Sequence, residues 1–162
     1  MQMHPGQQKS RQTGPSAPGP FSKVSELMSR GVAITSHDST VKEAVVVMAK
    51  QGVDAIVVVD SQKKLIGSIS HQGIAIRAST GDKPVDELRV SDAMSSDTTS
   101  LSVSATVSDA LSLMVQRRSA WLPVVTHDGF VVGVLALSDI VSRAASPRDS
   151  RGAWLETGYR HS

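Results

Sequence analysis

The apolar positions between residues 24 and 144 fall into short segments whose spacing alternates between that of a strand and that of a helix. Four β-branched runs, paired across polar turns, predict strands: residues 55–60, 65–70, 122–126 and 131–136. Apolar residues recur at i, i+3, i+4 and i+7 after Thr40 and again after Thr106, which predicts a helix at each place. Shorter segments complete the pattern: a strand over 32–35 and helices over 74–78 and 140–144.

The two longer helices begin with the same device. Thr40 is followed three residues later by Glu43, and Thr106 is followed three residues later by Asp109. A hydroxyl residue and an acidic residue at this spacing, just before an apolar stripe, are typical of a capping box. Because the arrangement occurs twice, we interpret it as a true helix start in both places.

The whole pattern is duplicated. Residues 24–78 align without a gap with residues 90–144, Val24 against Val90, at an offset of 66 residues. About 15 of roughly 55 aligned positions are identical, which indicates an internal repeat. A unit of about 60 residues buries too little apolar surface to be comfortably stable alone. We therefore predict an α/β (α+β) fold in which two β-α-β-β-α repeats pack with pseudo-two-fold symmetry, with the functional site where they meet.

The organisation along the chain follows from the repeat. We expect a disordered N-terminal tail over residues 1–20, which are rich in Gln, Ser, Gly and Pro. The first repeat is predicted over residues 21–85 and the second over residues 86–146. Residues 147–162 lose the periodicity, so we predict a flexible C-terminal tail.

Composition narrows the classes of function. Hydrophobic residues make up 40% of the chain but aromatic residues only 3%, so the core is expected to be aliphatic. The absence of cysteine excludes disulfides, thiolate chemistry and cysteine-ligated metal centres. The five histidines have no metal-ligand spacing, so no metal site is expected. No nucleophile elbow accompanies the Ser, His and Asp residues, and we do not expect an enzyme.

Charge and hydropathy give further expectations. No segment approaches the run of about 18 apolar residues that a membrane span needs, so we expect a cytoplasmic protein with no membrane contact. The formal net charge is +2, and several of the basic residues lie in the two tails. Nucleic-acid binding usually needs clustered bases, so a nucleic-acid partner is not expected.

The duplicated motifs resemble the CBS domain family, whose domains occur in tandem pairs called Bateman modules. The second repeat carries the resemblance most clearly, in the following order: Met94, Thr106-Val107-Ser108-Asp109-Ala110, Met114, Leu122-Pro123-Val124-Val125, Asp128-Gly129, Gly133-Val134-Leu135 and Asp139-Ile140. The first repeat follows the pattern more loosely, with Val57 where the second has Pro123.

The resemblance implies two clefts between the repeats that bind an adenosine-containing ligand. AMP, ADP or ATP is the first expectation, and S-adenosylmethionine or NAD is the next. It also implies a regulatory module without an obligatory cofactor. As partners we expect a second copy of the chain, in a homodimer, and an unidentified regulated protein.

The family's ligand motif is a Gly, two apolar residues, Ser or Thr, two free positions, then Asp. The resemblance implies that the hydroxyl and the helix-start N–H groups meet a phosphate, and that the Asp accepts hydrogen bonds from ribose hydroxyls. The first repeat keeps the hydroxyl at Ser70 but has Gly73 in place of Asp. The second keeps Asp139 but has Ala136 in place of the hydroxyl.

Losing a charge-assisted hydrogen bond weakens binding by about 10- to 100-fold. We therefore predict that the cleft around Asp139 is the better site, and that the first strand of the second repeat, from Thr98 to Leu101, lines it. The candidate ligand-binding residues are Asp139, Thr98, Thr99, Ser100, Leu101, Ser70, Ile34, Thr35, Trp121 and Pro123.

Alternatives remain open for several of these residues. Asp139 also stands where a carboxylate caps a helix without any ligand, and Trp121 could pack in a core or a dimer interface instead of facing a ligand. Arg117 and Arg118 are interpreted as a solvated helix end, with a phosphate contact as the lesser possibility. Two other functions stay possible: a ligand-free structural or dimerisation module, and weak nucleic-acid binding through the basic tails.

Overall fold

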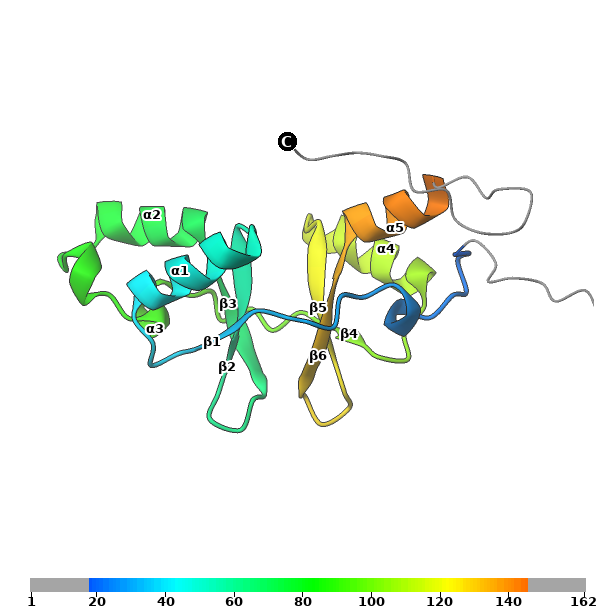
Figure 1. Ribbon diagram of the computed structural model, residues 1–162, viewed down its shortest axis with the longest axis horizontal. Coiled ribbons are helices and arrows are strands. Elements are labelled where there is room, and N and C mark those ends of the chain that lie inside the picture. Colours follow the sequence, from blue (N-terminus) through cyan, green and yellow to red (C-terminus); the bar gives the residue numbers. More distant parts are fainter. Residues whose placement is uncertain (1–17, 146–162) are drawn as a thin grey trace, which may run out of the picture.

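The structure, a computed structural model, describes residues 18–145; most of the predicted N-terminal tail and the C-terminal tail lie outside this range. The chain forms two similar halves that stand side by side (Figure 1). The elements in chain order are η1 (Val24–Glu26), β1 (Ile34–Ser36), α1 (Val41–Gln51), β2 (Ala55–Val59), β3 (Leu65–Ser70), α2 (His71–Thr80), η2 (Val85–Glu87), α3 (Val90–Ala93), β4 (Leu101–Ser102), α4 (Val107–Arg117), β5 (Trp121–Val125), β6 (Val131–Ala136) and α5 (Leu137–Ala145), where η marks a 3₁₀ turn.

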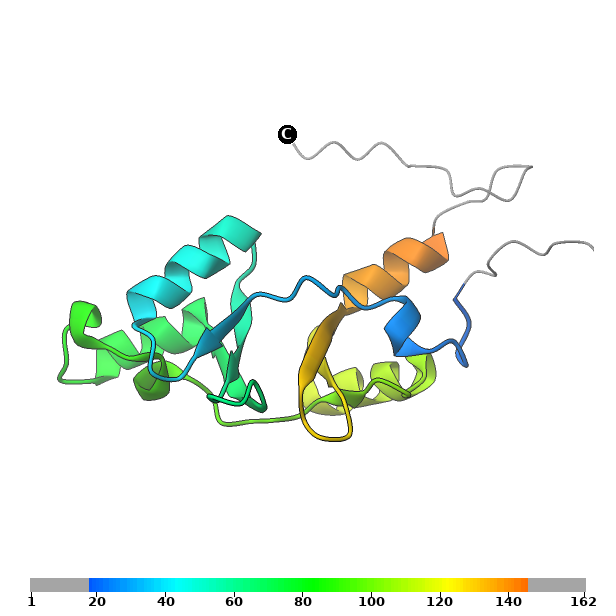
Figure 2. The same cartoon turned by 60° about the horizontal axis from the view of Figure 1, so that its bottom comes forward.

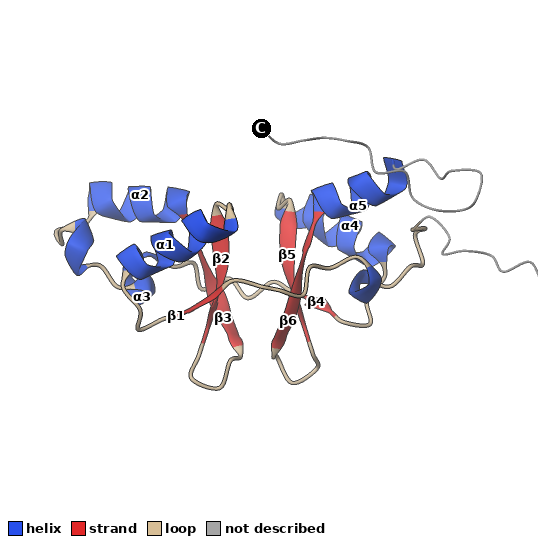
Figure 3. Ribbon diagram, viewed as in Figure 1, coloured by secondary structure: helices blue, strands red, loops and turns tan. Residues whose placement is uncertain are grey.

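Each half contains one three-stranded sheet, with the strand orders β1-β2-β3 and β4-β5-β6. The first two strands of each sheet run parallel, and the third runs antiparallel to the second. Figure 3 shows the two sheets facing each other in the middle of the molecule and the longer helices toward the outer sides. The register is also duplicated, because Ala55 pairs with Ser70 and Trp121 pairs with Ala136. The predicted mixed fold of two pseudo-symmetric repeats is confirmed.

Local sequence signals account for most boundaries. Strands β3 and β6 have the predicted bounds, whereas β1 begins two residues later than predicted. Both capping boxes are present: the Thr40 and Thr106 hydroxyls accept the N–H groups of Glu43 and Asp109, whose carboxylates accept the N–H groups of the two threonines in return. Helices α2 and α5 begin three residues earlier than predicted, directly at the ends of β3 and β6.

The two halves exchange the segments that precede them. Val24, Leu27 and Met28 pack in the core of the second half, and Leu88 and Val90 pack in the core of the first half. Figure 2 shows the crossing segments, blue and lime green, passing between the halves on opposite sides of the molecule. Each core therefore contains apolar side chains from the opposite repeat of the sequence.

Backbone hydrogen bonds fix both crossings. The N–H of Ser29 donates to the carbonyl of Val134 at 2.9 Å, and the N–H of Val134 donates back at 3.0 Å. The equivalent pair in the other half, Ser68 with Ser95, makes the same two bonds at 3.0 and 2.8 Å. Each crossing segment is therefore tied to the third strand of the opposite sheet.

Two glycines make these close approaches possible. A Cβ on Gly67 would overlap the carbonyl oxygen of Ser95, and a Cβ on Gly133 would lie 2.6 Å from the sulfur of Met28 and 2.9 Å from the carbonyl oxygen of Ser29. The duplicated glycine of the sequence motif thus serves the packing of the exchanged segments. Among residues 18–145, no helix is long and apolar enough to cross a membrane.

Candidate functional site

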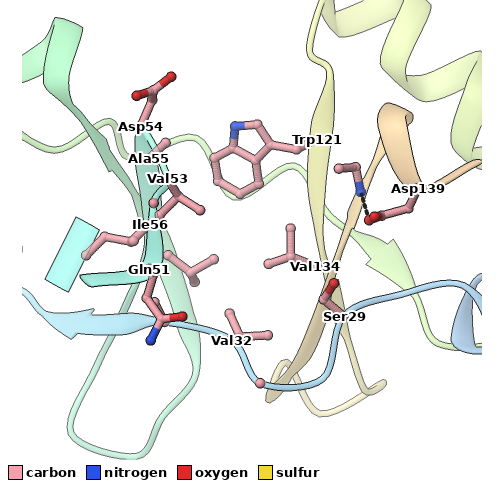
Figure 4. Close-up of a pocket in the computed structure, with 15 residues that line it drawn as sticks. Ser29, Val32, Gln51, Val53, Asp54, Ala55, Ile56, Trp121, Val134 and Asp139 are labelled. Atoms are coloured by element: carbon pink, nitrogen blue, oxygen red, sulfur yellow. Dashed lines mark hydrogen bonds between the residues drawn. The ribbon is translucent and has the colours of Figure 1, made fainter. Parts of the chain in front are cut away.

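A cleft of about 520 Å³ opens between the two halves (Figure 4). We call it the Asp139 cleft, and its lining residues are Ser29, Gly31, Val32, Ala33, Gln51, Gly52, Val53, Asp54, Ala55, Ile56, Val57, Trp121, Val134, Ala136 and Asp139. The volume lies within the range of about 300 to 1,000 Å³ that is usual for small-molecule sites. Most of the lining side chains are apolar, so the cleft can accept a largely apolar group.

Both halves build this cleft. The first half contributes Val32 and Ala33 before β1, the end of α1, and the first residues of β2. The second half contributes Val134 and Ala136 from β6 and Asp139 from α5. A molecule bound here would contact both halves at once.

Asp139 lies in the first turn of α5 and is half-buried. Its Oδ2 accepts the N–H of Ala136 at 3.1 Å, the contact drawn as a dashed line in Figure 4. A carboxylate has about four lone-pair sites, so this bond leaves it able to accept further hydrogen bonds. The positive end of the α5 dipole also favours negative charge at this position.

Trp121 begins β5, and its indole stands between the halves beside Ala55 (Figure 4). The side chain is half-buried and lines two clefts. The hydroxyl of Ser119 donates to the Trp121 carbonyl at 2.6 Å, which ties the start of the strand to the preceding loop. The indole is therefore placed where it can contact a bound ligand.

A second, smaller cleft of about 130 Å³ lies at the position related to the first by the repeat. We call it the Arg117 cleft, and its lining residues are Gly67, Ser68, Ser95, Asp97, Thr99, Arg117, Ser119, Trp121, Leu122 and Pro123. At the 66-residue offset, the bulky Trp121 stands here in the place that Ala55 takes in the Asp139 cleft. The two clefts therefore differ in side-chain size at this position, although the Trp121 side chain lines both of them.

The polar groups of the Arg117 cleft bind one another. Oδ1 of Asp97 accepts the hydroxyl of Thr99 at 2.6 Å and its N–H at 2.9 Å. These two bonds, and then the positive charge of Arg117, hold the pKa of Asp97 below its usual value. The Asp97 carboxylate is thus already engaged within the chain.

The structure separates residues that the sequence analysis grouped together. Asp139 and Trp121 line the same cleft, but Thr99 lines the opposite one, and Leu101 is buried in the core of the second half with 4% of its surface exposed. The wall predicted for Thr98 to Leu101 is made by Val32 and Ala33 of the first repeat instead. The exchange of the crossing segments is the physical reason.

The other candidates lie elsewhere. Ser70 is the N-cap of α2, and its Oγ accepts the N–H of Gly73 at 3.0 Å; among the described residues it lines neither cleft. Ile34 and Thr35 are in β1, where Thr35 is 7% exposed, and Pro123 in β5 lines the Arg117 cleft. Thr98 is exposed and Ser100 is half-buried in the segment before β4.

Sequence reasoning missed the residues that the first half contributes, including Gln51, Val53 and Asp54, and it missed Asp97 in the second cleft. The repeat offset relates the two clefts residue by residue, so Gln51 corresponds to Arg117 and Val53 to Ser119. That signal was available in the sequence. The offset does not reveal, however, that the residues before β1 lie in the same cleft as the start of α5.

Comparison with known proteins identifies the fold. A family model for the CBS domain matches residues 24–77 and 90–146. The chain belongs to the CBS domain family. The family resemblance seen in the sequence is therefore confirmed, and the two matched segments make this chain a CBS domain pair.

Curated relatives include proteins of two sizes. The CBS domain-containing protein YhcV of Bacillus subtilis is 31% identical over 145 residues, which cover 87% of this chain and 99% of YhcV. Inosine-5′-monophosphate dehydrogenase of Methanocaldococcus jannaschii is 32% identical over 137 residues, which cover 82% of this chain but 26% of the dehydrogenase. The CBS domain pair thus spans about a quarter of the dehydrogenase's length.

Solved structures have the same architecture. The crystal structure of the CBS domain of NE2398 matches with a TM-score of 0.69 and 27% identity over 77% of this chain and 99% of that one. CBSX2 in complex with AMP matches with a TM-score of 0.65 and 22% identity, over 76% of this chain and 96% of that one. The CBS domain pair of MJ0100, in complex with 5′-methylthioadenosine and S-adenosyl-L-methionine, matches with a TM-score of 0.66 and 20% identity, over 76% and 95%.

Proposed function

We propose that this CBS domain pair binds an adenosine-containing ligand in the Asp139 cleft and acts as a non-enzymatic regulatory module for a partner protein. The observation that carries the proposal is the carboxylate of Asp139, held at the start of α5 on the wall of a largely apolar cleft of about 520 Å³. The AMP complex of CBSX2 and the complex of MJ0100 with 5′-methylthioadenosine and S-adenosyl-L-methionine support an adenosine-containing ligand for this fold.

The chemistry of the cleft suits the parts of adenosine. A carboxylate can accept hydrogen bonds from both ribose hydroxyls, and Asp139 retains acceptor sites beside its bond to Ala136. Val32, Ala33 and Val134 supply an apolar slot for the flat adenine base. The indole of Trp121 is near enough to the cleft to stack on a base.

The position of the cleft gives a mechanism for regulation. Because residues from both halves line it, a bound ligand stabilises one relative arrangement of the halves over others. A protein partner that prefers this arrangement would bind more tightly when the cleft is occupied, by the reciprocity of linked equilibria. In this proposal the protein works in the cytoplasm, where adenosine compounds are available, and the output belongs to the partner.

The test is isothermal calorimetry and thermal unfolding with adenosine, 5′-methylthioadenosine, S-adenosylmethionine, AMP, ATP and NAD. A ligand present at 100 times its Kd should add about 2.7 kcal/mol of stability, which is several degrees in Tm. Asp139→Ala should weaken binding by about 10- to 100-fold. If no compound of this series binds at millimolar concentration, the proposal is wrong.

Thr106→Ala is the matched control for Asp139→Ala. Thr106 caps α4 and is not among the described residues that line either cleft, so its removal lowers stability by about 1 kcal/mol without changing the site. Ligand affinity should therefore be unchanged in Thr106→Ala. Equal loss of affinity in both variants would show that Asp139 acts only through stability.

A second candidate function is a structural module that has lost its ligand. One observation favours it: Ser70 and Asp139, the two surviving motif residues, each already accept a hydrogen bond from a backbone N–H of their own helix start. This candidate predicts that freshly purified protein carries no nucleoside and that no adenosine compound changes its Tm. Mass spectrometry of the denatured protein's supernatant separates the two functions.

We also propose that the module forms a homodimer through its helices. Ile76 on α2 is 56% exposed, Val115 on α4 is 78% exposed and Val141 on α5 is 56% exposed. Exposed apolar side chains on α2 of the first half and on the neighbouring helices α4 and α5 of the second half favour association with a second copy. Light scattering should give twice the monomer mass, and Val115→Glu with Val141→Glu should halve it; a monomeric wild type at micromolar concentration would disprove the dimer.

A further inference from the structure

We propose that the Asp139 cleft prefers adenosine compounds whose 5′ group is neutral or cationic over nucleotides with anionic 5′-phosphates. The inference rests on the adenosine binding proposed above and specifies the class of ligand. Its basis is the charge of the lining: Asp54 and Asp139 are acidic, and no lysine, arginine or histidine is among the described residues that line the cleft. A phosphate in the cleft would therefore meet no cation, and the Asp139 carboxylate would repel it.

The start of α5 lacks part of what a phosphate site needs, and the Asp139 carboxylate already lies at the positive end of its dipole. The N–H of Ala136 already donates to Asp139, and the N–H of Leu137 donates to the carbonyl of Ala120 at 2.7 Å. Ala136 also lacks the hydroxyl that Ser70 provides at the equivalent position of the other repeat. Two of the backbone donors at this helix start are thus occupied, and the side-chain donor that would hold a phosphate is missing.

The opposite end of the cleft is also unfavourable for an anion. Helix α1 ends at Gln51, and Gly52 caps it in the left-handed conformation, so the carbonyl end of the helix faces the cleft. That end carries the negative pole of the helix dipole. Asp54 follows three residues after Gln51 at the exposed edge of the cleft, with its carboxylate turned outward (Figure 4). At either end a 5′-phosphate would find no cationic side chain among the described residues that line the cleft.

The nearest basic residues in the sequence do not enter the cleft. Arg30 is exposed, and its guanidinium donates to the carbonyl of Ser25 at 3.4 Å. Lys50 is exposed in the last turn of α1. Charges at such exposed positions are screened by solvent and salt. These side chains do not compensate for the acidic lining.

The other cleft provides an internal contrast. At the 66-residue offset, Arg117 takes the place of Gln51, and it lines the Arg117 cleft. The chain therefore contains both versions of this position, one neutral and one cationic, on the same scaffold. Gln51→Arg and Ala136→Ser transfer groups that the other repeat already carries, and they are the natural variants for a test.

The experiment compares affinities in the full chain by tryptophan fluorescence and calorimetry, in a Trp154→Phe background so that Trp121 gives the signal. The ligands are 5′-methylthioadenosine and S-adenosylmethionine, with a neutral thioether and a sulfonium cation, and AMP and ATP. We expect the two sulfur compounds to bind at least about tenfold more tightly than AMP, since a missing charge-assisted contact weakens binding by about 10- to 100-fold. ATP should bind more weakly still.

The double variant Gln51→Arg, Ala136→Ser should bind AMP about tenfold more tightly and 5′-methylthioadenosine within about threefold of wild type. Wild-type protein that binds AMP or ATP as tightly as 5′-methylthioadenosine would overturn this inference and leave the proposed function standing. If no adenosine compound binds, the proposed function is wrong and the inference falls with it. The wild-type ligand series decides the question even where the double variant fails to fold.

Discussion

Ser70 and Asp139 make the two different hydrogen bonds of a capping box, one at the start of α2 and the other at the start of α5. Ser70 accepts the N–H of Gly73 at 3.0 Å at the start of α2, and Asp139 accepts the N–H of Ala136 at 3.1 Å at the start of α5. A complete capping box makes both bonds at one helix start. The residues missing from the ligand motif are therefore also the missing halves of the two caps, and site and helix stability are linked.

Completing the cap of α5 should stabilise the protein. Ala136→Ser places a hydroxyl where it can accept the N–H of Asp139, and we expect about 0.5 to 1 kcal/mol of additional stability in urea unfolding. Ala120→Ser is the control, since Ala120 is exposed and lies outside a helix start, and it should change stability by less than about 0.5 kcal/mol. A destabilised Ala136→Ser would show that the hydroxyl cannot reach the backbone.

Stability should be sensitive to an added side chain at Gly67 and Gly133, the two glycines at the crossings. Gly67→Ala forces its methyl into the Ser95 carbonyl, which is backbone and cannot move aside, so we expect a loss of about 3 kcal/mol or more. Gly133→Ala should be less severe, because the nearest atom belongs to the flexible side chain of Met28.

Gly31→Ala is the control for both glycine variants. Nothing lies within 4 Å of a Cβ at Gly31, so stability should change by less than about 0.5 kcal/mol. Guanidinium unfolding of the three variants measures the order. If Gly67→Ala were as stable as Gly31→Ala, the close crossing at Ser95 would not exist in solution.

Sequence reasoning was accurate where the signal is local. The alternation within residues 65–70 and 131–136 fixes which side chains face the core, and the structure has strands with these bounds. The capping boxes at Thr40 and Thr106 depend on four consecutive residues and were also predicted correctly. Strand β1 is three residues long, too short for periodicity, and its start was misplaced.

The site was harder to predict because it depends on contacts between distant segments. Asp139 was singled out from the ligand motif and Trp121 as one of the few aromatic residues of the chain, and the two line one cleft. Thr99 was placed beside Asp139 because both belong to the second repeat, yet it lines the opposite cleft. Val24 to Met28 cross to the second half, and this brings Val32 and Ala33, just before β1, to the Asp139 cleft. No local sequence pattern indicates this crossing.

Acid should destabilise the protein partly through Asp97 and Asp109. The pKa of Asp109 is lowered from its usual 3.8 by the backbone N–H of Thr106, and the pKa of Asp97 is lowered by its bonds to Thr99. A lowered folded-state pKa contributes stability that is present above pH about 4 and is lost as the pH falls through the folded pKa. Urea midpoints between pH 5 and pH 2 should therefore fall less steeply for Asp97→Asn and Asp109→Asn than for wild type. Identical slopes would contradict this account.

The exchange of crossing segments makes an unusual prediction about which half each core residue stabilises. Val24 and Val90 are fully buried, Val24 in the second half and Val90 in the first. Truncation of either to alanine should lower stability by about 2 kcal/mol, whereas Val115→Ala, at a position 78% exposed, should have little effect.

Hydrogen exchange shows where the stability is lost, because it reports local and partial opening as well as global unfolding. Val24→Ala should reduce amide protection most in β5 and β6, although Val24 belongs to the first repeat of the sequence. Val90→Ala should reduce it most in β2 and β3. Loss confined to each residue's own repeat would disprove the exchange. If the exchange holds, each half depends on the other for its core. The relative position of the two halves, and so the shape of the clefts, is then fixed by the two chain segments that cross between them.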